Sequence, residues 1–324
     1  MNRTTRTTSG GPGPRTGAPA KDPGAPVDAS GRAEAGRPGP DAALTWLYAP
    51  GDRPDVVSKA LLSGADVVLV DLEDAVGADR KDYARAATAE LLSDPVPGPA
   101  AVHVRINALD GPMCAGDLTA LAGLPGVGGL RLPKVASPAD VTAVVRALRE
   151  LAGEGAAMPA LYALLESALG VENAFAVATA DPAVRGLALG EADLRADLGL
   201  TDEEALAWPR VRTVVAARAA GLGPPAQSVY PDVRDLDGLA VSCRRGRSLG
   251  FFGRAAIHPR QLPVIERAYL PSEQEIAAAR ETVDAAAVSP GALALPDGRF
   301  VDPAMVAGAH RVLALASRAE AAYG

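Results

Sequence analysis

The chain has 324 residues, 48% of which are hydrophobic, and its formal net charge at pH 7 is −7. This length accommodates two ordinary domains or one large α/β barrel. The acidic balance argues against nucleic acid as the main partner, because nucleic-acid-binding proteins usually carry a basic face. No apolar run reaches the roughly 18 residues that a membrane span needs. The two cysteines, Cys114 and Cys243, lie far apart and fit a reduced, cytoplasmic setting without a zinc site.

The first 41 residues are rich in Gly, Pro, Thr, Ala and Arg and show no periodic apolar pattern. Such a segment buries too little surface to offset its chain entropy, so we predict a disordered tail. A transit peptide is the alternative, because Arg and Thr come first and acids are scarce at the start. That alternative requires an amphipathic stripe, which the segment lacks.

From residue 44 onward, short apolar runs alternate with longer stretches of helical pattern. The runs that predict strands are Leu44–Ala49, Val67–Val70, Ala101–Ile106, Gly129–Leu132, Ala160–Leu165 and Gly186–Leu189, with weaker candidates at Gln227–Tyr230 and Gly250–Phe252. The intervening helices are clearest at Asp55–Leu62, Lys81–Leu91, Pro138–Leu151 and Trp208–Ala220. Strands that alternate with helices form parallel βαβ units. Eight such units predict a TIM (β/α)8 barrel, with an open doubly wound sheet as the alternative.

Two further helices, Ser272–Ala287 and Pro303–Ala322, are predicted after the last strand, with a loop that contains Pro290, Pro296 and Gly298 between them. The sequence therefore predicts three parts. Residues 1–41 form the tail, residues 42–270 form the catalytic barrel, and residues 271–324 form a helical extension.

Polar residues follow most of the predicted strands. The clusters are Asp71–Asp74, Arg105–Asn107, Pro133 with Lys134, Glu166 with Ser167, and Gly190–Asp193. Because the carboxyl ends of barrel strands form one rim, where active sites are assembled, these clusters should converge. A single cluster would suit a solvated loop, whereas five in the same relative position favour an active site.

Two carboxylates stand out. Glu166 ends an apolar run, where a carboxylate is unfavourable unless it meets a cation or hydrogen-bond donors. Asp193 follows the next strand. Carboxylates from neighbouring strands, with positions left for water and substrate oxygens, suit Mg²⁺ acting as a Lewis acid. The structural alternatives are a salt bridge from Glu166 to Arg105 or Lys134, and a helix N-cap at Asp193.

Three other features could hold an anion or a proton. The segment Leu189–Leu194 has the pattern of a loop that opens into a helix, and free N–H groups at a helix start suit a carboxylate. Arg105 offers a planar fork of donors for a second oxyanion. His258 is a lone histidine after an apolar strand, and such a residue is more often a structural hydrogen-bonder than a catalyst.

The ordered set of motifs resembles the citrate lyase β-subunit and malyl-CoA lyase group of the HpcH/HpaI aldolase superfamily. The resemblance runs from about Leu44 to the end of the chain. The matching segments are Leu47–Gly51 with Lys59, Val70–Val76 with Lys81 and Arg85, Val104–Asn107, Leu132–Lys134, Leu165–Ser167, Gly190–Leu194, Ile257–Gln261 and Asp297–Asp302.

The resemblance implies a TIM barrel that assembles as a homotrimer or hexamer. It implies that Glu166 and Asp193 bind Mg²⁺, with Mn²⁺ as the alternative ion. Arg105 would contact the substrate, and the amides of Glu191 and Ala192 would hold the keto-acid carboxylate.

Further roles follow from the same resemblance. Asp302 would be the acid/base group and would reach into the site of a neighbouring subunit. The residues implied to line the path of coenzyme A are Tyr48, Lys59, Ile257 and His258. The residues implied to support the site are Asp71, Glu73, Asp74 and Lys134.

Four positions depart from the family pattern. Leu44 and Thr45 stand where the family usually has Arg-Ser, and Asp55 thins the basic cluster between Arg53 and Lys59. Arg131 stands where an apolar residue is more usual, and we interpret it as a charge at the rim. The first two departures concern the contacts with coenzyme A.

The predicted reaction cleaves a carboxylated 3-hydroxyacyl-CoA, such as malyl-, methylmalyl- or citramalyl-CoA, into an acyl-CoA and a keto acid. Arg105 would stabilise the thioester enolate and Asp302 would protonate it. The reverse condensation and thioester hydrolysis are further activities of such a site.

Two other functions remain as alternatives. A class II pyruvate aldolase would act without CoA and would use a histidine base at an early strand end, where this chain has Asp71, Glu73 and Asp74. An inactive barrel serving as an assembly subunit should have lost Glu166 or Asp302, and both are present.

Overall fold

The computed structural model describes residues 43–153, 156–288, 293–294 and 300–323, all within the unit formed by residues 37–324. The predicted tail lies outside the described residues, as do Pro290, Pro296 and Gly298 of the predicted loop. None of the described helices has the length and apolar character that a membrane crossing requires.

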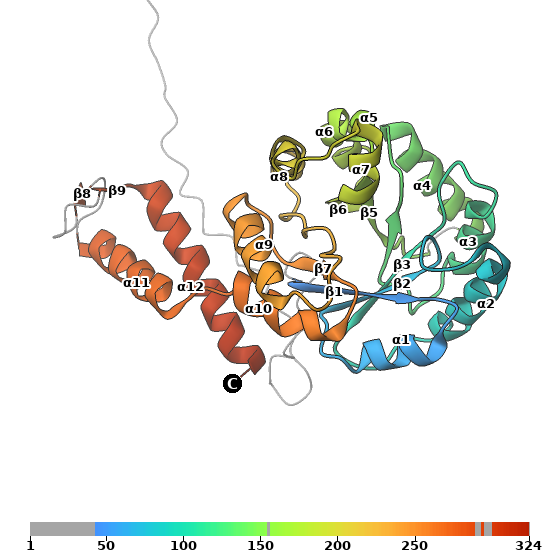
Figure 1. The fold of residues 1–324 in the computed structure, drawn as a ribbon, viewed down its shortest axis with the longest axis horizontal. Helices are drawn as coiled ribbons and strands as arrows, with labels where there is room; N and C mark the ends of the chain where they lie inside the picture. Colours follow the sequence, from blue (N-terminus) through green and yellow to red (C-terminus); the bar gives the residue numbers. More distant parts are fainter. Residues whose placement is uncertain (1–42, 154–155, 289–292, 295–299, 324) are drawn as a thin grey trace, which may run out of the picture. The chain divides into compact units, whose positions relative to one another are not determined.

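Seven parallel strands in the described part of the chain form one curled sheet (Figure 1). They are β1 (Thr45–Pro50), β2 (Val67–Asp71), β3 (Ala101–Arg105), β4 (Gly129–Leu132), β5 (Ala160–Leu165), β6 (Val184–Leu189) and β7 (Arg254–Ala256). Their order in the sheet is β6-β5-β4-β3-β2-β1-β7. A curled parallel sheet of this kind is consistent with a TIM-like barrel.

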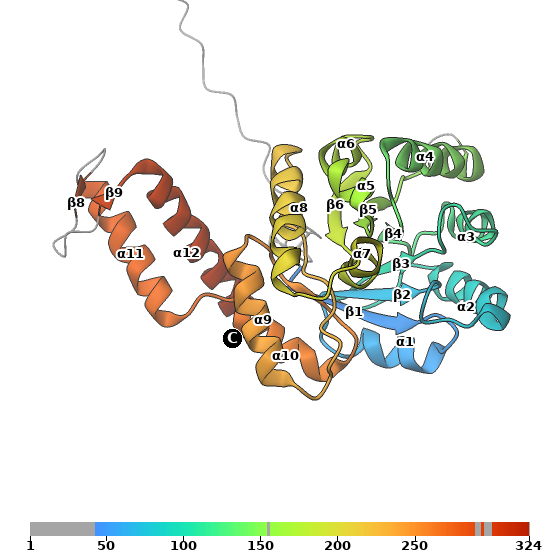
Figure 2. The same ribbon diagram turned by 45° about the horizontal axis from the view of Figure 1, so that its top comes forward.

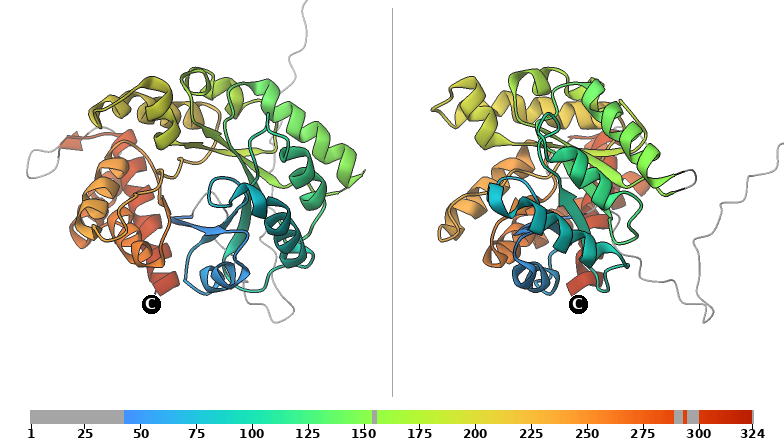
Figure 3. Two further views of the ribbon diagram at one scale, coloured as in Figure 1. Left: turned by 45° about the vertical axis from the view of Figure 1, so that its right-hand side comes forward. Right: turned by 90° about the vertical axis from the view of Figure 1, so that its right-hand side faces the viewer.

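Helices cover the outside of this sheet, as Figures 2 and 3 show for α1 to α4. The α-helices up to the last strand are α1 (Pro54–Leu61), α2 (Lys81–Leu92), α3 (Cys114–Leu121), α4 (Pro138–Ala152), α5 (Ala168–Glu172), α6 (Ala174–Ala178), α7 (Glu191–Leu198), α8 (Ala207–Ala219) and α9 (Leu236–Ser248). After it come α10 (Leu262–Tyr269), α11 (Glu273–Val288) and α12 (Pro303–Tyr323). Short 3₁₀ turns are η2 (Ala78–Arg80), η3 (Glu204–Leu206) and η4 (Pro259–Gln261).

Alternate side chains of each strand point to opposite faces of the sheet, and most of the side chains on both faces are buried. Leu47, Val68 and Leu130 belong to the large cluster that packs the sheet against its helices. Trp46 and Tyr162 belong to a second cluster on the inner face. The strand pattern of the sequence therefore places one set of side chains in the core and the other set inside the curl.

The two weaker strand predictions need correction. Residues Gly250–Phe252 follow the end of α9 and form no strand, since Gly250 and Gly253 have positive φ values of 96° and 79°. The last strand begins only at Arg254. The eighth position of the predicted barrel is a single bridge between Gln227 and Arg254.

Prolines limit that eighth position. Pro224 and Pro225 precede Gln227, and Pro231 follows closely. A proline has no N–H to donate to a ladder, so Pro224, Pro225 and Pro231 cannot act as donors in a longer ladder here.

The predicted C-terminal helices are present as α11 and α12, which lie side by side (Figure 1). Strands β8 (Leu293–Ala294) and β9 (Phe300–Val301) pair antiparallel between them.

Candidate active site

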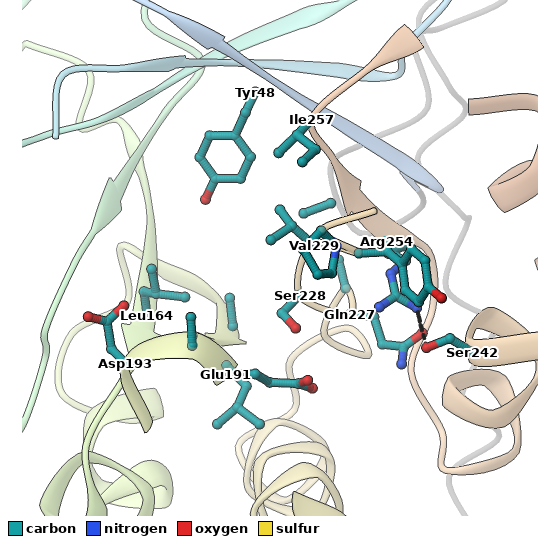
Figure 4. A pocket seen from close by; sticks show the side chains of 18 of the residues that line it. Tyr48, Leu164, Glu191, Asp193, Gln227, Ser228, Val229, Ser242, Arg254 and Ile257 are labelled. Atoms are coloured by element: carbon teal, nitrogen blue, oxygen red, sulfur yellow. Dashed lines mark hydrogen bonds between the residues drawn. The ribbon is translucent and has the colours of Figure 1, made fainter. Parts of the chain in front are cut away.

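A cavity of about 1070 Å³ lies at the carboxyl ends of the strands and extends inward (Figure 4). Most of the predicted strand-end clusters contribute to its lining. The predicted site residues that line it are Tyr48, Asp71, Asp74, Arg105, Glu166, Glu191, Ala192, Asp193 and Ile257. The convergence follows from the parallel order of the strands, which brings their carboxyl ends to one edge.

Arg105, at the end of β3, is held by three carboxylates. Its Nε and Nη2 lie 2.7 Å and 2.6 Å from the two carboxylate oxygens of Asp71. Its Nη1 lies 3.0 Å from Glu73 and 3.1 Å from Asp74. Burial acts to lower the pKa of Arg105, but the hydrogen bonds and charge of Asp71 outweigh it, and the pKa is raised. The planar fork that the sequence suggested for a ligand is therefore occupied by Asp71, and the second N–H of Nη2 remains for substrate.

Asp71 is fixed by its own loop. Its carboxylate also accepts hydrogen bonds from the backbone N–H groups of Glu73 and Ala75. Because Asp71 is buried and bonds two nitrogens of Arg105, the pair holds the guanidinium in a defined orientation at the cavity wall.

Glu166, which follows β5, is 5% exposed. Its Oε2 accepts a hydrogen bond of 2.9 Å from the backbone N–H of Lys134. No described cation forms an ion pair with it, so the structural alternative, a salt bridge to Arg105 or Lys134, is not formed. Burial raises the pKa of Glu166 to about 8, and the charges of Glu73 and Asp193 contribute to the rise.

Lys134 reaches this position through an unusual backbone. Its φ of 53° is the only positive value among the described residues other than glycine. Left-handed backbone is unfavourable for a residue with a side chain and tends to occur at functional sites. The conformation directs the N–H of Lys134 to Glu166, while its Nζ lies 3.3 Å from Glu73.

Gly190 connects β6 to α7 and lies against the side chain of Glu166. A Cβ atom built on Gly190 would lie 2.4 Å from Cγ of Glu166. The glycine therefore leaves the space that the carboxylate of Glu166 occupies.

Helix α7 begins directly after Gly190, which occupies the N-cap position. Asp193 is the third residue of the helix, so the alternative that it is the N-cap is wrong. It is exposed and faces the cavity (Figure 4). The N–H groups of Glu191 and Ala192 belong to the first turn, where they have no acceptor within the helix.

The start of α7 is anchored by Arg210 of α8, which the sequence analysis missed. Its Nε and Nη2 lie 2.7 Å and 2.6 Å from the two carboxylate oxygens of Glu191. The two residues are 19 positions apart, a spacing with no helical or strand period, so only the fold reveals the pair.

The carboxylates fit a divalent cation. Glu73, Glu166 and Asp193 lie close enough that the first and third raise the pKa of Glu166. A cation bound by Glu166 and Asp193 would offset this repulsion. The described residues contain no cluster of three or more His, Cys, Asp or Glu that would enclose a metal. Two protein carboxylates with water or ligand oxygens in the other positions match the coordination of Mg²⁺.

Five predicted residues do not line this cavity, and two of them, Glu73 and Lys134, contact residues that do. Lys59 is 77% exposed and forms an ion pair with Asp55. His258 accepts a hydrogen bond from the N–H of Arg260 and begins η4. Asp302 precedes α12, where its carboxylate accepts a hydrogen bond of 2.8 Å from the N–H of Met305.

Arg131 was misplaced by the sequence analysis. It is 4% exposed and lies inside the curl of the sheet, not at the rim. The signal was present in β4, where Gly129 and Arg131 alternate with the buried Leu130 and Leu132. In a strand with this alternation, Arg131 must face the inside if the leucines face the helices.

Paired carboxylates that face backbone donors at the carboxyl ends of parallel strands are typical of barrel enzymes that bind a metal. The family is shown by comparison with known proteins. The model of the family described as HpcH/HpaI aldolase/citrate lyase matches residues 44–259. The chain belongs to this family, and it is a carbon–carbon lyase, as the sequence predicted.

Relatives resemble the chain over most of its length. Citrate lyase subunit beta of Leuconostoc mesenteroides subsp. cremoris is 32% identical and aligns with 84% of this chain and 93% of its own. A (3S)-malyl-CoA thioesterase of Cereibacter sphaeroides is 34% identical over 86% of this chain and 95% of its own.

A solved structure matches as well. It is that of protein CitE from Mycobacterium tuberculosis in complex with magnesium, acetoacetate and coenzyme A. It is 34% identical, has a TM-score of 0.73, and the match covers 85% of this chain and 98% of that one.

Proposed function

We propose that this chain is a magnesium-dependent lyase that cleaves a carboxylated 3-hydroxyacyl-CoA, such as malyl-, methylmalyl- or citramalyl-CoA, into an acyl-CoA and a keto acid. The observation that carries this proposal is the buried Glu166, with its raised pKa, beside Asp193 at the open end of the cavity. The Mycobacterium tuberculosis relative in complex with magnesium, acetoacetate and coenzyme A supports the choice of metal and substrate class.

Glu166 and Asp193 would hold the metal, with Mn²⁺ as a substitute for Mg²⁺. When bound, the ion supplies Lewis-acid polarisation of the substrate hydroxyl or carbonyl oxygen. The N–H groups of Glu191 and Ala192 would bind the carboxylate of the keto acid, because the start of a helix favours an anion. The ion pair between Arg210 and Glu191 would fix the direction of these donors.

Cleavage of the carbon–carbon bond places negative charge on the enolate of the thioester. The remaining N–H of Arg105 would stabilise that charge, with Asp71 holding the guanidinium in place. Asp302 of a neighbouring subunit would protonate the enolate carbon, which makes the functional unit a homo-oligomer, trimeric or hexameric. Tyr48 and Ile257 line the cavity, and with Lys59 and His258 they would border the path of coenzyme A.

Thioester hydrolysis is the second candidate activity. The Cereibacter sphaeroides relative is named as a thioesterase, and a site that stabilises an enolate can also activate water. Condensation of an acyl-CoA with a keto acid is the same reaction in reverse.

The test is to incubate the purified protein and Mg²⁺ with a panel of short 3-hydroxyacyl-CoA esters, with product masses as the readout. We expect an acyl-CoA and a keto acid from at least one ester, and no products after EDTA treatment until Mg²⁺ or Mn²⁺ is restored. Cleavage of free hydroxy acids without CoA would favour the pyruvate aldolase alternative. Absence of turnover on every substrate would favour the inactive barrel.

A further inference from the structure

The cavity contains a second arginine that the proposed reaction does not use. Arg131 lies in β4, where its Cα is in register with Arg105 of β3 and Tyr162 of β5. It is 4% exposed, yet it lines the main cavity and also a small neighbouring pocket of about 20 Å³. Arg131 is therefore shielded from bulk solvent, but its side chain forms part of the cavity wall, where a ligand could contact it.

Arg131 differs from the other buried arginines in its partners. Arg105 pairs with three carboxylates, and Arg210 pairs with Glu191 and Glu203. Arg254 donates hydrogen bonds to Gln227 and Ser242. Within the described part of the chain, Arg131 and Arg254 both lack a carboxylate partner and an acceptor for Nε, and of these four arginines Arg131 alone has no side-chain acceptor for its guanidinium.

The immediate surroundings of Arg131 are aromatic and uncharged. Its guanidinium lies 5.2 Å from the centre of the Trp46 ring, which contacts the rings of His103 and Tyr162. Burial and the charge of Arg131 lower the pKa of His103 to about 3, so this histidine is neutral. A ring face attracts a cation but does not neutralise it. A buried charge without a counter-ion is unfavourable, so this arrangement favours an anion that enters from the cavity.

The route from the metal ligands to Arg131 suits a short carbon chain. On β5, Leu164 is the next inward-facing residue below Glu166, and Leu164 and Ala188 line the same cavity. The hydroxyl of Ser228, which also lacks a described partner, lies in this cavity (Figure 4). An apolar wall that leads from the carboxylate pair to a guanidinium fits a methylene arm that ends in a carboxylate.

We propose that Arg131 binds a second carboxylate of the substrate, and that the chain therefore prefers hydroxyacyl-CoA esters whose keto-acid product is a dicarboxylate. This inference rests on the proposed lyase function. It assigns Arg131 as a specificity-determining residue, apart from Arg105 and the metal ligands. It also gives a reason for a charge at a position that is otherwise part of the inner core.

The test measures Mg²⁺-dependent binding of keto acids by calorimetry, with pyruvate compared with oxaloacetate and 2-oxoglutarate. We expect the wild-type protein to bind one of the dicarboxylates at least about tenfold more tightly than pyruvate, the effect of one hydrogen bond to a charged group. Arg131→Met should abolish this preference and leave the Kd for pyruvate within about twofold. Arg131→Lys keeps the charge and should retain part of the preference.

Two further measurements separate binding from folding. Arg185→Met is the matched control, because it removes an exposed guanidinium of β6 that does not line the main cavity, and it should keep the preference. The melting temperature of Arg131→Met in the absence of ligand should equal or exceed that of wild type, because the variant loses an uncompensated charge. A clear fall would indicate a structural role.

An equal preference in wild type and Arg131→Met would overturn the assignment of Arg131, while the lyase proposal would stand. Binding of pyruvate and of both dicarboxylates with equal affinity by wild type would overturn it too. Failure of wild type to bind any keto acid with Mg²⁺ would instead contradict the proposed function, and this inference with it.

Discussion

Glu166 combines three properties that rarely coincide in one carboxylate: burial, two negative neighbours and a single backbone donor. Its ordinary pKa of 4.5 is raised to about 8 in the folded chain. An unfolded chain therefore releases this proton at lower pH than the folded chain does. The stability that the protonated carboxyl contributes is present below about pH 4.5 and is lost as the pH rises through about 8.

The first prediction concerns this titration. In metal-free protein, the free energy of unfolding should fall from pH 5 to pH 8, by roughly 1 kcal/mol per pH unit from Glu166 at most. Glu166→Gln removes the titration, so its curve should be flatter than that of wild type. Urea denaturation between pH 5 and 9 measures both, with the exposed Glu172→Gln as control. Parallel curves for wild type and Glu166→Gln would contradict the prediction.

The second prediction concerns Arg105. Arg105→Lys keeps the charge but cannot reproduce the two parallel hydrogen bonds to Asp71, so we expect kcat/KM to fall by more than about tenfold. Arg149→Lys, at an exposed ion pair with Asp181, is the control and should show no effect. A loss smaller than tenfold would remove the oxyanion role from Arg105.

At the junction of β6 and α7, the absence of a side chain at Gly190 leaves room for the Glu166 carboxylate. The third prediction is that Gly190→Ala lowers Mg²⁺ affinity by about 10-fold to 100-fold, since the new Cβ would displace the Glu166 carboxylate. Calorimetric titration with Mg²⁺ measures the change. Gly308→Ala adds the same methyl group in α12, where its nearest neighbour is 3.7 Å away, and should leave affinity unchanged. Unaltered affinity in Gly190→Ala would show that Glu166 does not bind the metal.

The elements show what the sequence could and could not predict. Strands β1 to β6 and the helices α1, α2, α4 and α8 were predicted within about two residues, because their apolar periodicity is strong. The last strand was placed too early, since the positive φ of Gly253 is set by packing against Leu44 and leaves no apolar pattern. Arg131 was misread because its charge was weighed before its place in the strand alternation.

At the scale of the whole molecule, the C-terminal segment provides the test of the proposed shared site. As the cap of α12, Asp302 should contribute about 1 kcal/mol to stability. As the acid of a neighbouring site, it should contribute roughly 10² or more to turnover. The fourth prediction is that mixed oligomers of Asp302→Ala and Glu166→Ala protomers regain part of the activity that each variant lacks alone.

The readout is turnover after verified subunit exchange. Complementation requires an interface that pairs an intact metal site with an intact Asp302. Mixed oligomers of Glu166→Ala with Asp193→Ala are the control, because both changes affect one metal site and cannot restore it across an interface. Persistent inactivity of the Asp302 and Glu166 mixture would rule out a shared site.

The fifth prediction is that deletion of residues 1–40 changes neither activity nor oligomeric state, because this Gly- and Pro-rich segment lacks a periodic apolar face. Turnover and size-exclusion elution of the truncated and full-length proteins provide the comparison. A fall in melting temperature of several degrees would show that the segment packs on the folded unit.

At this scale, the sequence predicted the parallel α/β fold and the converging polar rim, since both follow from local patterns repeated along the chain. It could not predict the ion pair between Arg105 and Asp71 or that between Arg210 and Glu191. Asp71 meets Arg105 only when β2 pairs with β3 in the observed register, and Arg210 meets Glu191 only when α8 packs beside the start of α7, so neither pair follows from a spacing along the chain.

The backbone hydrogen bond from Lys134 to Glu166 affects how this protein tolerates mutation. Every amino acid except proline carries that N–H, so replacement of the Lys134 side chain does not by itself remove the donor. A substitution of Lys134 can therefore change the side chain while the backbone hydrogen bond to Glu166 persists. The backbone conformation limits the choice of residue at position 134. Glycine and asparagine accept left-handed backbone most readily, so they are the expected replacements.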